Sequence, residues 1–182
     1  MSSYCPECWE EVPAEAECCP GCGRSLVTDG EQYVDKLIAA LRHFEPTRAG
    51  LAVYILSEML HEPRAVAPLI DLLDTARDTF VLKSAAVALG RFADERAVPA
   101  LARRALDLST PLVVRVAAVD ALARVGGDQV RAVIEGALAD PSRTVRDHAK
   151  RALGYGHPAD EACGAAATEP APRMIEHNSR RS

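Results

Sequence analysis

Four cysteines near the N-terminus form two copies of one short motif. The first copy is CPEC at residues 5–8, the second is CPGC at residues 19–22, and ten residues separate them. In each copy a tight turn brings two thiolates toward the same metal ion. Four thiolates in a tetrahedron suit Zn²⁺ and leave no coordination position open for a substrate. The spacing predicts one structural zinc ion, with these ligands: Cys5, Cys8, Cys19 and Cys22.

The alternative to a metal site is a pair of disulfides, which a reducing cytosol disfavours. A segment of about 20 residues is too short to bury a hydrophobic core, and a bound metal replaces one. Cys18 is the odd cysteine of the segment, because only Cys19 has the two-residue gap and the following proline. We expect Cys18 to be a bystander and Cys163, far from both motifs, to be incidental.

Charge is distributed unevenly along the chain, whose net charge is −5. Residues 1–30 hold one arginine against six acidic residues, whereas residues 31–156 hold 17 basic against 16 acidic residues. A general affinity for nucleic acid requires a clustered basic face. The neutral body gives no support to that function, and the acidic stretch WEEVPAEAE between the cysteines would repel phosphate.

Beyond residue 30 the chain becomes periodic. Apolar residues at i, i+3, i+4 and i+7 or i+8 predict helices that each bury one stripe. One series of such helices, the B helices, recurs with a step of 32 residues at Val34, Val66, Val98 and Val130.

A second series, the A helices, alternates with the B helices at a spacing of 31 to 33 residues. Small residues at Ala85, Ala118 and Ala149 predict close approach between neighbouring A helices. Gly90 and Gly154 stand where two of these helices are expected to end. Repeated helix pairs of this kind predict an all-α body.

Composition agrees with a helical fold. Hydrophobic residues make up 48% of the chain and aromatic residues only 4%, a balance that favours close-packed helices over sheets. We expect the scattered Tyr54, Phe80 and Phe92 to pack within this body. No apolar run approaches the roughly 20 residues that span a bilayer, and the N-terminus lacks the pattern of a signal peptide. The chain is therefore expected to be cytoplasmic, without a membrane partner.

Two family resemblances follow from these motifs. The strings VRDHAKRALG, AAVALGRFADERAVPAL and DPSRTVR resemble short bacterial HEAT-like repeats of the phycobilin-lyase type. The cysteine segment resembles the small bacterial zinc ribbons, whose knuckles commonly read CPxCG, and departs from them at Trp9, which we expect to pack on the ribbon. The resemblance implies a right-handed α-solenoid of about four helix pairs. The expected domains are a zinc ribbon at 1–28, the solenoid at 29–156 and a disordered tail at 157–182.

Arg115 and Arg146 occupy a recurring position of the A helices. In HEAT-like stacks this arginine usually pairs with an aspartate in a turn of a neighbouring unit, so we expect a structural role for both. Asp140, in the turn before the last A helix, belongs to a stretch expected to cap that helix.

The resemblance implies binding of another protein on a concave face lined by B helices. The charged positions expected there are Lys36, Asp71, Arg103, Arg104, Asp107 and Glu135. These charges could equally form a solvated face. The leading hypothesis is a non-catalytic scaffold, because no Ser/His/Asp or Cys/His arrangement can be placed. The alternatives are nucleic-acid binding through the ribbon and a bilin-lyase-like protein, since such repeats also occur in bilin lyases.

Overall fold

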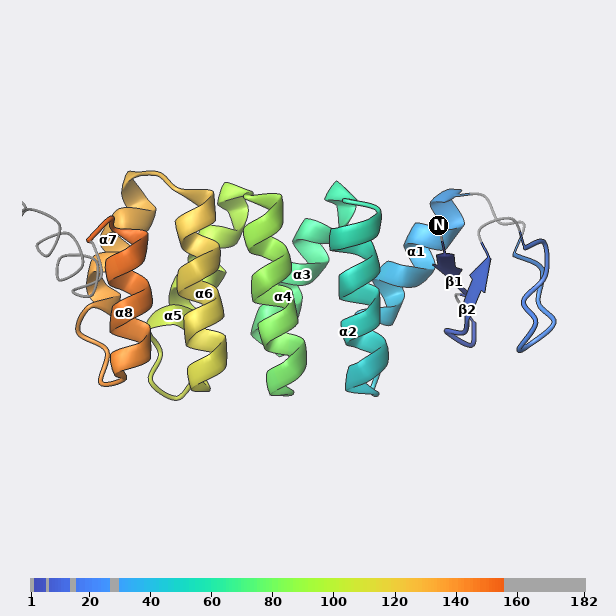
Figure 1. The fold of residues 1–182 in the computed structure, drawn as a ribbon, viewed down its shortest axis with the longest axis horizontal. Coiled ribbons are helices and arrows are strands. Elements are labelled where there is room, and N and C mark those ends of the chain that lie inside the picture. Colours follow the sequence, from blue (N-terminus) through green and yellow to red (C-terminus); the bar gives the residue numbers. More distant parts are fainter. Residues whose placement is uncertain (1, 6, 14–15, 27–29, 156–182) are drawn as a thin grey trace, which may run out of the picture.

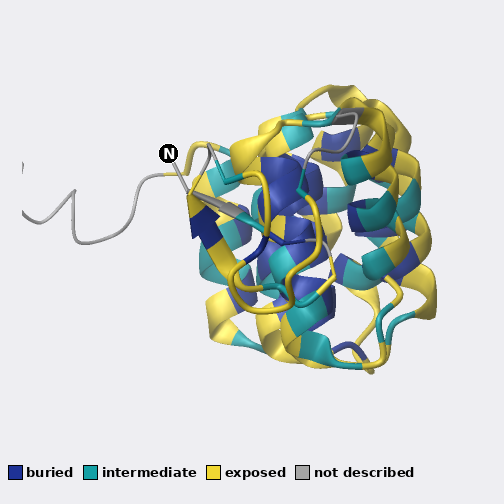
Figure 2. Ribbon diagram, turned by 90° about the vertical axis from the view of Figure 1, so that its right-hand side faces the viewer, coloured by how far each residue is buried: buried dark blue, intermediate teal, exposed yellow. Residues whose placement is uncertain are grey.

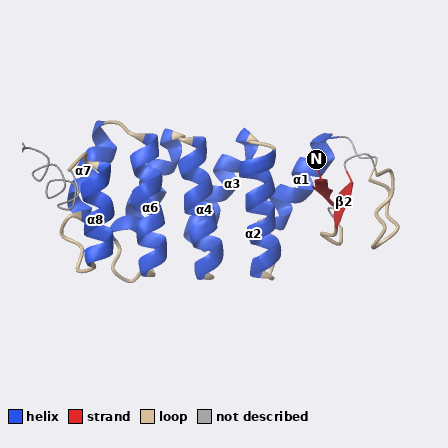
Figure 3. Ribbon diagram, in the orientation of Figure 1, coloured by secondary structure: helices blue, strands red, loops and turns tan. Residues whose placement is uncertain are grey.

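The computed structural model describes residues 2–5, 7–13, 16–26 and 30–155. The predicted tail and the predicted domain boundary at residue 28 lie outside these residues. Within them the secondary structure is two short strands followed by helices (Figure 3). None of the described helices is both long and apolar enough to cross a membrane.

The two strands form a small antiparallel hairpin at the N-terminal end. Strand β1 (Ser2–Tyr4) pairs with β2 (Glu11–Pro13), and Ser3 lies opposite Val12. Among the described residues of this region, three form a buried cluster: Cys5, Val12 and Cys19. The hairpin therefore supports the cysteines without a core of its own.

Eight α-helices follow within the described residues. They are α1 (Gly30–Ala40), α2 (Pro46–Tyr54), α3 (Val66–Thr75), α4 (Thr79–Phe92), α5 (Val98–Leu106), α6 (Leu112–Val125), α7 (Asp128–Ala137) and α8 (Arg143–Ala152). A π-helical turn, η1 (Ile55–Met59), continues α2, and short 3₁₀ turns, η2 (Pro63–Ala65) and η3 (Glu95–Ala97), precede α3 and α5.

The helices stack as two layers, and together they form an α-solenoid. The predicted A helices (α2, α4, α6 and α8) make one row, and the predicted B helices (α1, α3, α5 and α7) make the row behind it (Figure 1). Seen along the stack, buried residues lie between the rows and exposed residues on the outside (Figure 2). Leu37, Leu69 and Leu101 are at most 1% exposed. The predicted alternation of helix pairs is confirmed.

Gly90 has a different role from the predicted one. Helix α4 does not end there but continues to Phe92 and is capped by Ala93, whose φ of 51° is left-handed. Gly90 is buried, and a Cβ added to it would lie 2.7 Å from Cα of Ala121 in α6. The glycine therefore permits close contact between two A helices. Gly154, with φ of 79°, follows α8 as predicted.

The two recurring arginines also differ from each other. Arg115 is buried and pairs with Asp140 in the turn before the next A helix, with Nε 3.0 Å from Oδ2. It also donates to the backbone oxygen of Thr110 at 2.6 Å. Arg146 donates instead to the backbone oxygens of Asp140 and Pro141 in the turn before its own helix, at 2.7 and 2.9 Å. The predicted pairing with a turn aspartate is correct for Arg115 and wrong for Arg146.

Candidate metal centre

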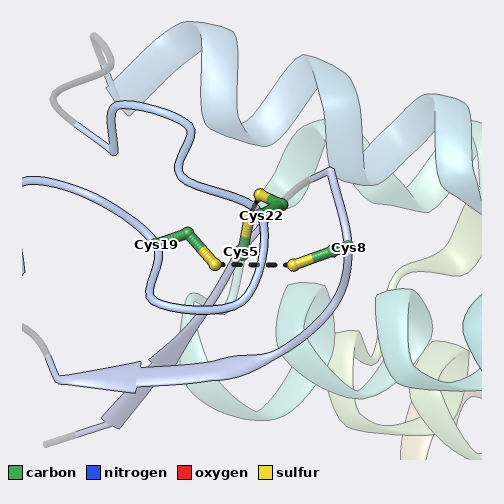
Figure 4. A group of neighbouring side chains, drawn as sticks. All are labelled: Cys5, Cys8, Cys19 and Cys22. Atoms are coloured by element: carbon green, nitrogen blue, oxygen red, sulfur yellow. Dashed lines mark hydrogen bonds between the residues drawn. The ribbon is translucent and has the colours of Figure 1, made fainter.

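The sulfur atoms of the four predicted ligands lie within 4.8 Å of one another. The Sγ atoms of Cys5 and Cys22 are 3.7 Å apart, and those of Cys8 and Cys19 are 3.4 Å apart. A tetrahedron with Zn–S bonds of about 2.3 Å has S···S edges of about 3.8 Å, whereas a disulfide bond is about 2.05 Å long. The described cysteines are free, and these four side chains point toward one another (Figure 4). Their arrangement therefore has the size of a four-thiolate metal cage.

The backbone repeats the duplication that the sequence shows. In each knuckle, the first cysteine accepts a hydrogen bond from the residue four positions on and donates one to the residue five positions on. The N···O distances are 2.9 Å for Trp9 to Cys5 and Cys5 to Glu10, and 2.8 Å for Gly23 to Cys19 and Cys19 to Arg24.

Trp9 adopts the backbone conformation that glycine has in the second knuckle. Its φ is 65°, and the φ of Gly23 is 70°. This left-handed region disfavours a bulky residue. Trp9 adopts it nevertheless, so the first knuckle keeps the turn geometry of the second. Together with Tyr4, the half-buried Trp9 ring packs against the solenoid core. Trp9 is thus a packing residue, but it packs against the solenoid core and not against the small buried cluster around the cysteines.

The thiols of the cage differ in acidity. Burial raises the pKa of Cys5, but hydrogen bonds from the backbone N–H groups of Cys8 and Glu7 outweigh it and bring the pKa to about 7. The backbone N–H of Glu10 lowers the pKa of Cys8, but burial and the three neighbouring thiols raise it to about 12. Cys5 is therefore more readily ionised than Cys8, and binding of a metal at this site must displace the proton of the Cys8 thiol.

A charge cluster joins the metal module (residues 2–26) to the solenoid. The carboxylate of Glu7 accepts a hydrogen bond from Nζ of Lys36 in α1 at 3.1 Å and lies 3.8 Å from Arg24. The bond to Lys36, together with the charge of Arg24, lowers the pKa of Glu7. The module and the first B helix are therefore in direct contact.

The charged residues predicted to bind a partner already have partners within the chain. Their contacts are Lys36 with Glu7, Asp71 with Arg42, Arg103 with Asp74, Arg104 with the Leu73 carbonyl, Asp107 with Ser109, and Glu135 with Arg131. Two of these contacts, those of Arg103 and Arg104, connect α5 to α3. Lys36 and Arg104 are half-buried, contrary to their predicted exposure. That these residues also bind a partner remains a prediction.

Some of these residues share one shallow hollow of about 390 Å³. It is lined by Asp74, Arg103, Arg104 and Asp107. The structure does not bring Lys36, Asp71 or Glu135 into it. Three of the six predicted residues therefore lie together at one hollow, and the other three lie elsewhere on the B layer.

Two aromatic residues that were expected to pack are exposed. Tyr54 in α2 is 52% exposed and Phe80 in α4 is 54% exposed, although both were expected to pack. Both line a cavity of about 360 Å³ between these two A helices. Phe80 directly precedes the buried Val81 in α4. Adjacent residues of a helix do not lie on the same face, so the position beside a core valine could have indicated that Phe80 is exposed.

Comparison with known proteins supports the helical repeats. Residues 34–113 match the family model of HEAT repeats. The matched residues run from α1 to the start of α6, so the match covers part of the solenoid. A solved structure with a similar fold is human deoxyhypusine hydroxylase in complex with glycerol, with a TM-score of 0.57 and 24% identity. The match covers 67% of this chain and 42% of that enzyme, so the likeness extends to the fold alone. No curated protein matches the chain.

Proposed function

We propose that this protein is a non-catalytic scaffold that binds another protein through its HEAT solenoid. The observation that carries the proposal is the stack itself, in which HEAT repeats bury their apolar residues between two layers. Both layers then present extended outer faces, and extended faces of this kind are the binding surfaces of repeat proteins.

The metal module is proposed to be a zinc ribbon that stabilises the N-terminal end of the scaffold. Its support is the closed set of four sulfurs at distances that fit Zn²⁺. A zinc ion bound there would hold the two knuckles together. Because all four positions would be filled by cysteine, the site is proposed to be structural.

The resemblance to an enzyme structure does not alter this proposal. The match covers less than half of deoxyhypusine hydroxylase, and no activity is carried over from it. Nucleic-acid binding through the module is opposed by the exposed carboxylates of Glu10, Glu11 and Glu17. The bilin-lyase-like alternative predicts a coloured protein, so mixing the purified chain with bilin and recording its visible absorbance tests it.

The main test is a pull-down with the tagged full chain from native lysate, with and without nuclease, followed by mass spectrometry. A stoichiometric protein that survives nuclease is the expected result. Material lost on nuclease treatment would replace this proposal with nucleic-acid binding through the module. Absence of any stoichiometric protein would overturn the scaffold function.

A further inference from the structure

The two layers of the solenoid differ in which apolar side chains they expose. Among the described helices α1–α8, the large apolar residues that are exposed on the A layer are Tyr54, Phe80, Leu112 and Val113. The B layer exposes only Leu106, at the last residue of α5. A cluster of exposed apolar residues on one face marks an interaction site more often than isolated ones do.

The layers also differ in their unpaired charges. Every lysine and arginine on the described B helices has an acceptor within the chain. On the described A helices four cations have no ion-pair or hydrogen-bond partner: Lys83, Arg124, Lys150 and Arg151. The acidic residues of the A helices, Asp120 and Asp147, are paired with His148 and Arg143. The A layer therefore has a surplus of positive charge.

One site combines both properties. The cavity between α2 and α4 has aromatic walls from Tyr54 and Phe80 and two charged residues on its lining, Lys83 and Glu58. The carboxylate of Glu58 is paired with Arg91, which leaves Lys83 as the unpaired charge of the lining. Its volume of about 360 Å³ is within the range of ligand pockets. An apolar anchor inserted between aromatic walls with a charge beside it has the composition of an interface hot spot.

Resting on the scaffold function proposed above, we infer that the groove between α2 and α4 binds an acidic peptide segment of the partner protein. One aromatic or aliphatic side chain of that segment enters the cavity, and a neighbouring carboxylate pairs with Lys83. Charge complementarity favours an acidic segment as the occupant. In the described part of the chain, the A helices carry unpaired cations, whereas both of their acidic residues are paired.

The test is selection of peptides from a random display library on the immobilised full chain. Selected peptides are expected to carry Asp or Glu within a few residues of an aromatic or aliphatic anchor. Peptides without acidic enrichment, or failure to select any peptide, would overturn the inference.

Three variants then locate the binding site, with affinities measured by fluorescence anisotropy. Lys83→Glu should weaken binding of a selected peptide about fivefold or more, with the effect reduced at high salt. Ser84→Trp should abolish binding by filling the groove. Arg131→Glu in α7 makes the same kind of change in charge on the B layer, outside the residues predicted to bind a partner, and should leave binding within twofold of the wild-type value. Circular dichroism checks that each variant keeps its helicity.

The outcomes separate the two proposals. If Arg131→Glu weakens binding while Lys83→Glu does not, the B layer is the binding face and the groove is excluded. If the A-layer variants retain the protein captured from lysate, the groove inference fails while the scaffold function stands. If wild-type protein captures no partner at all, the scaffold function itself fails.

Discussion

The metal module and the solenoid are adjacent in one chain but are stabilised by different means. The module has a buried cluster of only three residues, two of them cysteines. The solenoid has one continuous core of Leu, Val, Ile and Ala from α1 to α8. A segment too small to bury apolar surface depends on covalent or metal cross-links, whereas a stack of helix pairs does not. The two parts should therefore respond to different perturbations.

Duplication also preserves different properties in the two parts. The knuckles keep a left-handed residue at corresponding positions, although the side chains of Trp9 and Gly23 could hardly differ more. The helix pairs instead keep the size and apolar character of residues such as Leu37, Leu69 and Leu101. The module repeats a backbone conformation, and the solenoid repeats a packing surface.

Loss of the metal should produce the largest effect and should be confined to the module. Cys19→Ser removes one of four ligands, and structural zinc sites contribute about 10–16 kcal/mol of apparent binding free energy at pH 7. We expect zinc content to fall from one ion per chain to near zero and amides of residues 2–26 to exchange rapidly. Helicity at 222 nm should remain close to the wild-type value.

Cys18→Ser provides the matched control for this prediction. Cys18 is exposed, lies outside the sulfur cluster, and should leave the zinc content unchanged. If Cys18→Ser lost zinc as completely as Cys19→Ser, the assignment of ligands would be wrong. A large loss of helicity in Cys19→Ser would show that the two parts are not stabilised independently.

A cavity in the solenoid core should have the next largest effect. Leu122 in α6 is fully buried, and Leu122→Ala should lower the free energy of unfolding by about 2–5 kcal/mol in urea titrations. Leu112→Ala, at a position 41% exposed in the same helix, serves as control and should cost much less. Equal losses for both variants would contradict the assignment of Leu122 to the core.

A methyl group at Gly90 tests the close contact between α4 and α6. The added Cβ would lie 2.7 Å from Cα of Ala121, so Gly90→Ala should destabilise the chain by about 1–3 kcal/mol. Gly136→Ala meets only the Leu106 side chain, at 3.4 Å, and should be nearly neutral or stabilising. A neutral Gly90→Ala variant, measured by thermal melting, would mean that the helices separate without cost.

The smallest expected effect concerns the end of α4. Ala93 is exposed with φ of 51°, and Ala93→Gly should raise the free energy of unfolding by about 1 kcal/mol because glycine adopts this conformation freely. Ala132→Gly at an exposed helical position in α7 should lower it by roughly 0.5–1 kcal/mol. Opposite signs for the same substitution would confirm the left-handed cap, and equal signs would contradict it.

Local spacing was sufficient to predict which four cysteines come together and how the two helix series alternate. The ligands follow from two short turns, each closed by hydrogen bonds between residues four and five positions apart. The helices follow from a period of 3.6 residues within single segments. Both kinds of pattern involve neighbours in the sequence, so no knowledge of the tertiary arrangement was needed.

Contacts between repeats were predictable only in part. The pair of Arg115 with Asp140 agrees with the pattern of HEAT-like stacks. No later repeat follows Arg146 among the described residues, and its guanidinium donates to carbonyl oxygens in the turn before its own helix. Gly90 stands near the end of its apolar run and gives no local sign that α6 approaches it.

The sequence by itself determined the sulfur cage and the order of the helices, because these depend on residues that are close along the chain. Tertiary structure alone decided which charges pair across the B layer and which side chains remain exposed on the A layer. Arg103 meets Asp74, 29 residues away, and Phe80 stays exposed beside Gly50 in the preceding A helix. Such contacts depend on how one repeat is rotated and shifted against the next, which the packing of the whole stack sets.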